Sequence, residues 1–277
     1  MRRALVLGGG GVTGVAWELG LLAGLVERGV PVTEADLVVG TSAGSVVGAL
    51  VCSGLSVQRF YEEQLAPPSS EVAARLGFAT LARLVWAGGR TRDAARSRAR
   101  IGAMALAART PSEASRRAVI EARLPAREWP QRRLLVTAVD ASSGEFVVFD
   151  RDSEVSLVDA VGASCAVPGV WPPVTIGARR FVDGGMRSTV NADLAAGAER
   201  VLVLAPTSAA IGPMPRLSAQ VDGLRAAGSR VSVLTPDAAA RTAIGRNVLD
   251  PARRAGAARA GRAQAAAVLE EVAALWA

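Results

Sequence analysis

The feature that most constrains the fold is a tight turn between a buried strand and a helix. Residues 37–39 are all apolar and predict a short strand, and Gly-Thr-Ser-Ala-Gly at residues 40–44 follows directly. An apolar pattern of helical period then runs from Ala43 to Cys52, which predicts a helix. A G-x-S-x-G turn in this setting exposes the serine hydroxyl at the head of a sheet. Ser42 is therefore a candidate nucleophile.

The chain contains no histidine, and this excludes the usual partner of a nucleophilic serine. A serine hydroxyl is a weak nucleophile until a base removes its proton. Because a Ser-His-Asp triad needs an imidazole, such a triad is impossible here. Either Ser42 is not catalytic, or another side chain is its base.

The rest of the chain predicts strands that alternate with helices. Strands are predicted at residues 4–7, 133–139, 145–149, 181–182, 201–204 and 231–234, and helices at 14–28, 57–65, 157–164 and over most of 250–276. This alternation indicates an α/β fold with a mostly parallel central sheet and helices on both faces. We expect one domain over residues 1–277, with the core motifs in 3–205 and a C-terminal strand and helix in 206–277.

An arginine-rich insertion is predicted at about residues 69–133. The net charge is +7, and all 32 basic residues are arginine. Residues 88–133 hold twelve arginines and four acidic residues, an excess larger than the net charge of the chain. Arginine favours phosphate and carboxylate, so the insertion suits an anionic membrane surface, although an arginine-rich composition alone explains it equally well. We expect no nucleic acid as partner.

A helix that ends at Leu124 is predicted within the insertion. The four residues before it, Thr110-Pro111-Ser112-Glu113, resemble a capping box with proline at the first helical position.

The N-terminus resembles a signal peptide, because Arg2 and Arg3 precede an apolar run. The glycines at 8–11 would break its helix, however, and Glu18 interrupts the next apolar stretch. Residues 37–58 are uncharged and long enough to span a membrane, but the strand, turn and helix account for them better.

Cys52 and Cys165 are far apart and predict buried free thiols, which fit a reducing compartment. We expect a cytoplasmic protein, with peripheral membrane contact as an open alternative.

A glycine-rich loop at residues 9–14 has three interpretations. Its sequence, Gly-Gly-Gly-Val-Thr-Gly, matches the G-x-G-x-x-G dinucleotide fingerprint. The acid that should close the second strand is missing, because Glu34 and Asp36 precede that strand. The amides of Gly9, Gly10 and Gly11 would alternatively form an oxyanion hole beside a helix N-terminus. The third interpretation is a plain tight turn.

Asp183 is the candidate base. It ends a predicted strand and precedes Gly184 and Gly185, although Asp-Gly-Gly is also an ordinary turn. Because the carboxyl ends of parallel strands meet at one edge of a sheet, we expect Asp183 to share a crevice with Ser42. A carboxylate within hydrogen-bond reach acts directly as a base. Burial between Pro168, Trp171 and the sheet would raise its pKa from the ordinary ~3.9.

Together these motifs resemble the patatin-like phospholipases. The segment Ala-Ser-Cys-Ala-Val-Pro-Gly-Val-Trp-Pro-Pro-Val at residues 163–174 strengthens the resemblance, because that family has a similar A-S-x-A-x-P-x-x-F-P-P stretch before its aspartate. The resemblance covers residues 3–205. It implies a serine hydrolase with a Ser42–Asp183 dyad that cleaves fatty-acyl esters, of phospholipase A or lysophospholipase type. The residues implied to support the dyad are the oxyanion-hole amides of Gly9, Gly10 and Gly11 and the motif glycines Gly14, Gly40, Gly44, Gly184 and Gly185.

One position departs from the family pattern. The family often has Arg or Lys before the last glycine of the loop, where this chain has Thr13, so the oxyanion hole would rely on amides alone. Two alternatives remain open: a Rossmann-type oxidoreductase that binds a nucleotide through residues 9–14, and a non-catalytic module that binds anionic surfaces.

We predict that chelators leave the turnover of a soluble ester unchanged. The resemblance implies a calcium-independent enzyme with no cofactor. The sequence has no histidine, no paired cysteines and no acidic cluster spaced like a calcium loop. The check is the rate of ester hydrolysis with and without EDTA. Activity lost to EDTA and restored by calcium would contradict the dyad.

Overall fold

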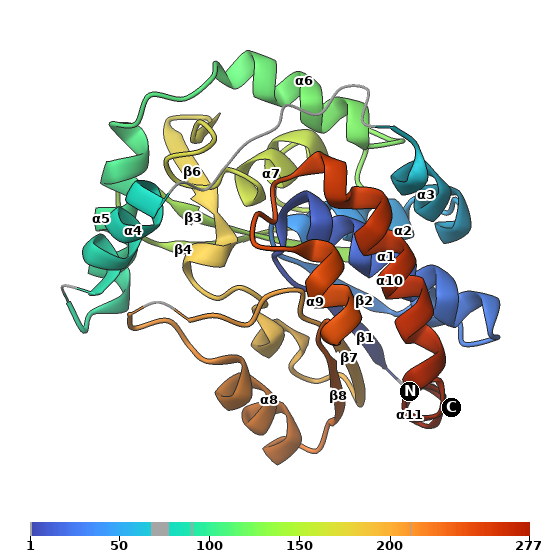
Figure 1. Cartoon of the computed structure of the whole chain (residues 1–277). Helices are drawn as coiled ribbons and strands as arrows, with labels where there is room; N and C mark the ends of the chain where they lie inside the picture. The colour runs from blue at the N-terminus through green and yellow to red at the C-terminus, as the bar shows by residue number, and fades with distance from the viewer. Residues whose placement is uncertain (1, 68–77, 90, 211) are drawn as a thin grey trace.

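A computed structural model describes residues 2–67, 78–89, 91–210 and 212–277 (Figure 1). An eight-stranded sheet has the order β5-β6-β3-β2-β1-β7-β8, with β4 also paired to β3. Its strands are β1 (Arg3–Leu7), β2 (Leu37–Gly40), β3 (Arg133–Asp140), β4 (Phe146–Phe149), β5 (Val174–Ile176), β6 (Arg179–Asp183), β7 (Arg200–Leu204) and β8 (Arg230–Leu234).

The sheet is mixed but mostly parallel. Strands β3, β2, β1, β7 and β8 run in parallel, and β4, β5 and β6 form the antiparallel pairs. The central strand β1 is buried on both faces after its first residue, as strands of parallel sheets covered by helices are. The predicted α/β class is therefore confirmed.

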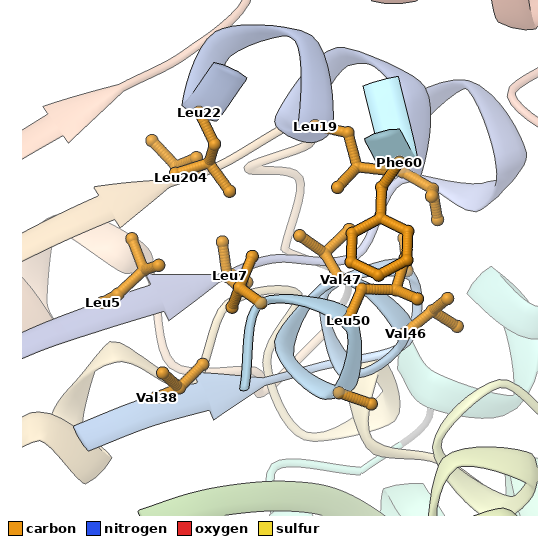
Figure 2. Close-up of a cluster of buried hydrophobic side chains, with 14 of the residues drawn as sticks. Leu5, Leu7, Leu19, Leu22, Val38, Val46, Val47, Leu50, Phe60 and Leu204 are labelled. Carbon is orange, nitrogen blue, oxygen red and sulfur yellow. The ribbon is translucent and has the colours of Figure 1, made fainter. Parts of the chain in front are cut away.

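Alternate residues of β1 face two different cores. Leu5 and Leu7 pack under α1 (Gly11–Glu27) and α2 (Ala43–Cys52), as Figure 2 shows, whereas Ala4 and Val6 face the opposite layer. This period of two follows from the pleat of a strand. The other helices in the described part of the chain are α3 (Val57–Leu65), α4 (Phe78–Gly89), α5 (Ala94–Leu106), α6 (Glu113–Arg123), α7 (Leu157–Ser164), α8 (Leu217–Ala226), α9 (Ala238–Ile244), α10 (Arg254–Ala267) and α11 (Leu269–Trp276).

Helix α10 near the C-terminus packs closely against α1 near the N-terminus (Figure 1). A Cβ atom on Gly20 would lie 2.0 Å from the Ala258 carbonyl oxygen, and one on Gly261 would lie 2.2 Å from that of Trp17. Only glycine permits such an approach of the two backbones. The Trp17 indole N–H also donates to Gln264 Oε1 (2.9 Å). The C-terminal helix thus helps to hold α1, which begins at the glycine-rich loop.

Several predicted elements have the expected bounds, notably α2, α3 and α7. Two local predictions are corrected. Helix α1 begins at Gly11 rather than at residue 14. Ser112, not Thr110, caps α6, because its side chain accepts the N–H of Ser115. Strand β5 and helices α4, α5, α8 and α9 were not predicted. Residues 69–77 and 90 of the predicted insertion lie outside the described residues.

Cys52 and Cys165 are buried and free, as predicted. In the part of the chain that the structure describes, no helix combines the length and the hydropathy of a membrane span.

Candidate active site

Ser42 occupies a strained turn between β2 and α2. Its φ of 53° and ψ of −117° lie in a region that residues with a side chain rarely adopt. Gly44 makes the turn sterically feasible, because a Cβ there would lie 2.1 Å from the Leu7 carbonyl oxygen. A Cβ at Gly40 would likewise lie 2.5 Å from the Cα of Ser45. The two glycines of the motif therefore let α2 start directly on the sheet edge.

Three side chains fix the backbone of Ser42. The Ser42 N–H donates to Ser164 Oγ (2.9 Å), and its carbonyl oxygen accepts from Ser45 Oγ (2.7 Å) and Cys165 Sγ (3.3 Å). A strained conformation persists where its surroundings over-determine it in this way. The sequence interpretation included Ser164 and Cys165 in the segment at residues 163–174 but assigned them no role.

Asp183 reaches the same edge of the sheet by an unexpected route. Gly40 pairs with Val136 of β3, and Asp183 pairs with Ala138, two positions further along β3. Strand β3 thus extends past the end of β2, and β6 returns along this extension in the antiparallel direction. The expected meeting of Ser42 and Asp183 is found, but Asp183 ends an antiparallel strand, which corrects the parallel arrangement expected from the sequence.

The carboxyl group of Asp183 is buried, with 3% of the residue exposed. Burial raises its pKa to about 7, while its interaction with the Ser42 side chain and the N–H of Gly185 partly offset that rise. The Gly185 N–H donates to Asp183 Oδ1 at 2.7 Å. The increase expected from burial is therefore present. A base whose pKa lies near neutral pH suits proton transfer at that pH.

The glycine-rich loop lies beside Ser42, but its three amides are not equivalent. A Cβ on Gly9 would lie 3.5 Å from the Ser42 Cβ, so the loop and the elbow are neighbours. The Gly9 N–H donates to the Thr189 carbonyl oxygen (2.7 Å) and is already used. Gly10 caps α1 and Gly11 begins it, so their N–H groups are among the first-turn donors that have no acceptor within a helix. Of the three amides predicted to form an oxyanion hole, those of Gly10 and Gly11 therefore remain as candidates.

Thr13 lies at the position before the last glycine of the loop, where the family pattern often has Arg or Lys. Its side chain makes a structural contact instead. Thr13 is fully buried, and its hydroxyl and N–H both donate to the Val248 carbonyl oxygen, at 3.2 Å each. Thr13 therefore ties α1 to the segment before α10, and its hydroxyl is used by that contact.

Asn191 links the serine turn to the aspartate turn, and the sequence interpretation missed it. Its Nδ2 donates to Thr41 Oγ1 (3.0 Å) and to the carbonyl oxygens of Ser188 (2.8 Å) and Gly184 (3.4 Å). Thr41 precedes Ser42 and Gly184 follows Asp183. The buried amide thus bridges the two turns. No motif in the sequence signals it, because a single asparagine gives no periodic pattern.

A small chamber of about 30 Å³ opens beside Ser42. Val12, Val15 and Val46 supply an apolar wall and continue into a neighbouring cavity of about 300 Å³. The chamber alone has room for about one water molecule, so most of a bound ester would lie in the larger cavity. Within the described residues, no group of three or more cysteine, aspartate or glutamate side chains is placed to hold a metal ion.

The chain is similar to several known proteins. The family model for patatin-like phospholipase matches residues 5–196. Patatin-like phospholipase domain-containing protein 6 of Mus musculus and of Homo sapiens are each 54% identical over 56 residues, which are 20% of this chain but only 4% of those proteins. The solved structure of VipD from Legionella pneumophila has a TM-score of 0.51 at 15% identity, over 98% of this chain and 67% of VipD. This last similarity shows a shared fold.

Proposed function

Since this chain belongs to the patatin-like phospholipase family, a family of serine hydrolases, we propose that it is a lipid acyl hydrolase of phospholipase A or lysophospholipase type with a Ser42–Asp183 dyad. The observation that carries the proposal is the strained Ser42 turn beside a buried Asp183 whose pKa is raised to about 7. Family membership also favours this function over the nucleotide-binding oxidoreductase.

The proposed reaction has two halves. Asp183 removes the proton of Ser42 as the hydroxyl oxygen attacks the ester carbonyl, and the amides of Gly10 and Gly11 stabilise the oxyanion. The tetrahedral intermediate collapses, and the alcohol leaves with the proton from Asp183. Asp183 then takes a proton from water, which attacks the acyl-enzyme and releases the fatty acid while Ser42 recovers its proton.

Labelling with a fluorophosphonate tests this function directly. The probe reacts with an activated serine, and peptide mapping should locate the adduct on Ser42. Denatured protein and a Ser42→Ala variant should remain unlabelled. Absence of label on folded wild-type protein would contradict the proposal, as would tight NAD binding without esterase activity.

We also propose peripheral contact with anionic membranes through α5. Arg92, Arg96 and Arg100 are exposed on or just before this helix. Trp86 of the adjacent α4 is 65% exposed, and Figure 1 places α4 and α5 together at one end of the molecule. Arg98 differs from the others, because its Nε donates to the Gly144 carbonyl oxygen (2.6 Å) in the turn between β3 and β4.

Replacing Arg92, Arg96 and Arg100 together with glutamine should weaken binding to phosphatidylglycerol vesicles by about tenfold or more, because each basic residue near an anionic bilayer contributes about 1 kcal/mol. Co-sedimentation at low and high salt measures the effect. Arg98 is kept because of its contact with the turn.

The matched control removes three exposed arginines elsewhere, Arg216, Arg246 and Arg259. It should bind vesicles like the wild type, and both triple variants should hydrolyse a water-soluble ester normally. Equal binding of the wild type to phosphatidylcholine vesicles, or binding that salt does not change, would contradict the electrostatic explanation.

A further inference from the structure

Two arginines of the insertion line the chamber of Ser42. Arg116 and Arg123 are seven residues apart on α6, and this spacing places both on one face of a helix. Both side chains line the chamber that contains Ser42. Arg116 is only 8% exposed, and its guanidinium carbon lies 4.0 Å from the ring centroid of Trp171. Stacking on an aromatic ring orients a guanidinium group.

The charge in this chamber has one sign. Among the described residues that line it, Arg116 and Arg123 are the ones with a formal charge. Burial and the Asp183 carboxylate raise the pKa of the Cys165 thiol, whereas Arg116 and Arg123 lower it. Cys165 Sγ donates to the Ser42 carbonyl oxygen, so the thiol on which the two arginines act lies directly against the serine turn.

Part of the lining is apolar. Val12, Val15 and Val46 line both the chamber and the larger cavity, and Arg123 lines both as well, while Glu63 and Arg254 line the larger cavity alone. A bound molecule would therefore contact both aliphatic side chains and the guanidinium groups next to Ser42. This combination fits an amphiphile with a hydrocarbon chain and an anionic group.

We propose that Arg116 and Arg123 bind a phosphate group of the substrate and thereby select anionic acyl esters over neutral and zwitterionic ones. The planar guanidinium group donates paired hydrogen bonds that match phosphate oxygens. The inference rests on the proposed function for the reaction and adds the side chains that determine its selectivity.

The kinetic test compares three esters with the same dodecanoyl chain: the monoglyceride, the lysophosphatidylcholine and the lysophosphatidic acid. All are supplied below the concentration at which micelles form, so that surface charge does not contribute. The wild type should prefer the anionic ester. Arg116→Gln and Arg123→Gln should each lower the anionic-to-neutral ratio of kcat/KM by about tenfold or more, as expected for a lost hydrogen bond to a charged group.

The ratio is the readout because a general loss of folding or of dyad geometry lowers both rates together. Arg123→Lys should keep part of the preference, since the charge remains while the planar fork is lost. The matched control is Arg127→Gln, which removes the same charge from an exposed side chain just after α6. It should leave the ratio unchanged.

A binding test does not depend on turnover. Calorimetry with the Ser42→Ala variant should show tighter binding of dodecyl phosphate than of dodecyl phosphocholine, and adding Arg123→Gln should weaken the former by about tenfold or more. Inorganic phosphate should compete only weakly. Competition as strong as that of dodecyl phosphate would assign the site to free phosphate and overturn the substrate assignment.

The outcomes separate this inference from the proposed function. An unchanged ratio in arginine variants that still hydrolyse the monoglyceride would overturn the inference alone. If folded wild-type protein hydrolyses none of the three esters, the proposed function fails and substrate selection fails with it. Arginine-dependent binding of dodecyl phosphate in that case would identify a phosphate-binding site without hydrolysis.

Discussion

Replacing Ser42 with alanine is expected to reduce kcat/KM for a short p-nitrophenyl ester to less than about one hundredth of the wild-type value, a loss above ~2.7 kcal/mol. The reason is that alanine has no oxygen with which to form the acyl-enzyme, and no other serine of the chain lies in a G-x-S-x-G turn. The measurement is steady-state hydrolysis, with circular dichroism to confirm the fold.

Two further variants sharpen this result. Ser53→Ala alters the residue that caps the far end of α2 and should retain near-normal activity. Ser42→Gly should be inactive but more stable to unfolding than Ser42→Ala by about 1 kcal/mol, because glycine has no Cβ to strain at positive φ. A Ser42→Ala enzyme that keeps more than about one hundredth of the activity would show that the nucleophile is another group.

Asp183→Asn should cost nearly as much, about a hundredfold or more, because a neutral amide cannot accept the serine proton. The same substitution at Asp152, an exposed residue in the loop before α7, is the matched control and should have little effect. A near-normal rate for Asp183→Asn would require a different base.

The pH profile should reveal the same group. Burial raises the pKa of Asp183 to about 7, and only the deprotonated carboxylate can act as a base. As the pH falls through this pKa, Asp183 gains a proton and kcat/KM decreases, so activity should be high above pH 7 and low below it. A midpoint close to the ordinary aspartate value of ~3.9 would contradict the effect of burial on this carboxyl group.

The serine turn was predictable because its determinants are local. An apolar strand, two glycines and an immediate helix occupy consecutive residues, and each constrains backbone geometry within one turn of the chain. Helix α2 accordingly begins at Ala43 as expected. Asp183 was also identified, from the end of its strand and the two glycines that follow.

Contacts between distant segments were beyond prediction from sequence pattern. Asn191 bridges Thr41 and Gly184 across the edge of the sheet, and the Gly9 N–H is used by Thr189. In the sequence Glu18 interrupts an apolar stretch, yet its side chain is fully buried, and burial raises its pKa well above the ordinary value. The contacts of Asn191 and Gly9 and the burial of Glu18 follow no period or spacing in the sequence, because they arise only when the strands pair and the helices pack.

The sequence by itself determined the α/β class and the serine turn, since these depend on hydrophobic periodicity and on local backbone geometry. It also singled out Asp183 as the candidate base, from the combination of the motifs. Tertiary structure decided that Asp183 arrives on an antiparallel strand, and that the Gly9 N–H is used by Thr189 whereas those of Gly10 and Gly11 lie in the first turn of α1. It also turned Arg116 and Arg123 into the chamber of Ser42. The physical reason is that strand register and helix packing are set by burial of surfaces far apart along the chain, which no local pattern encodes.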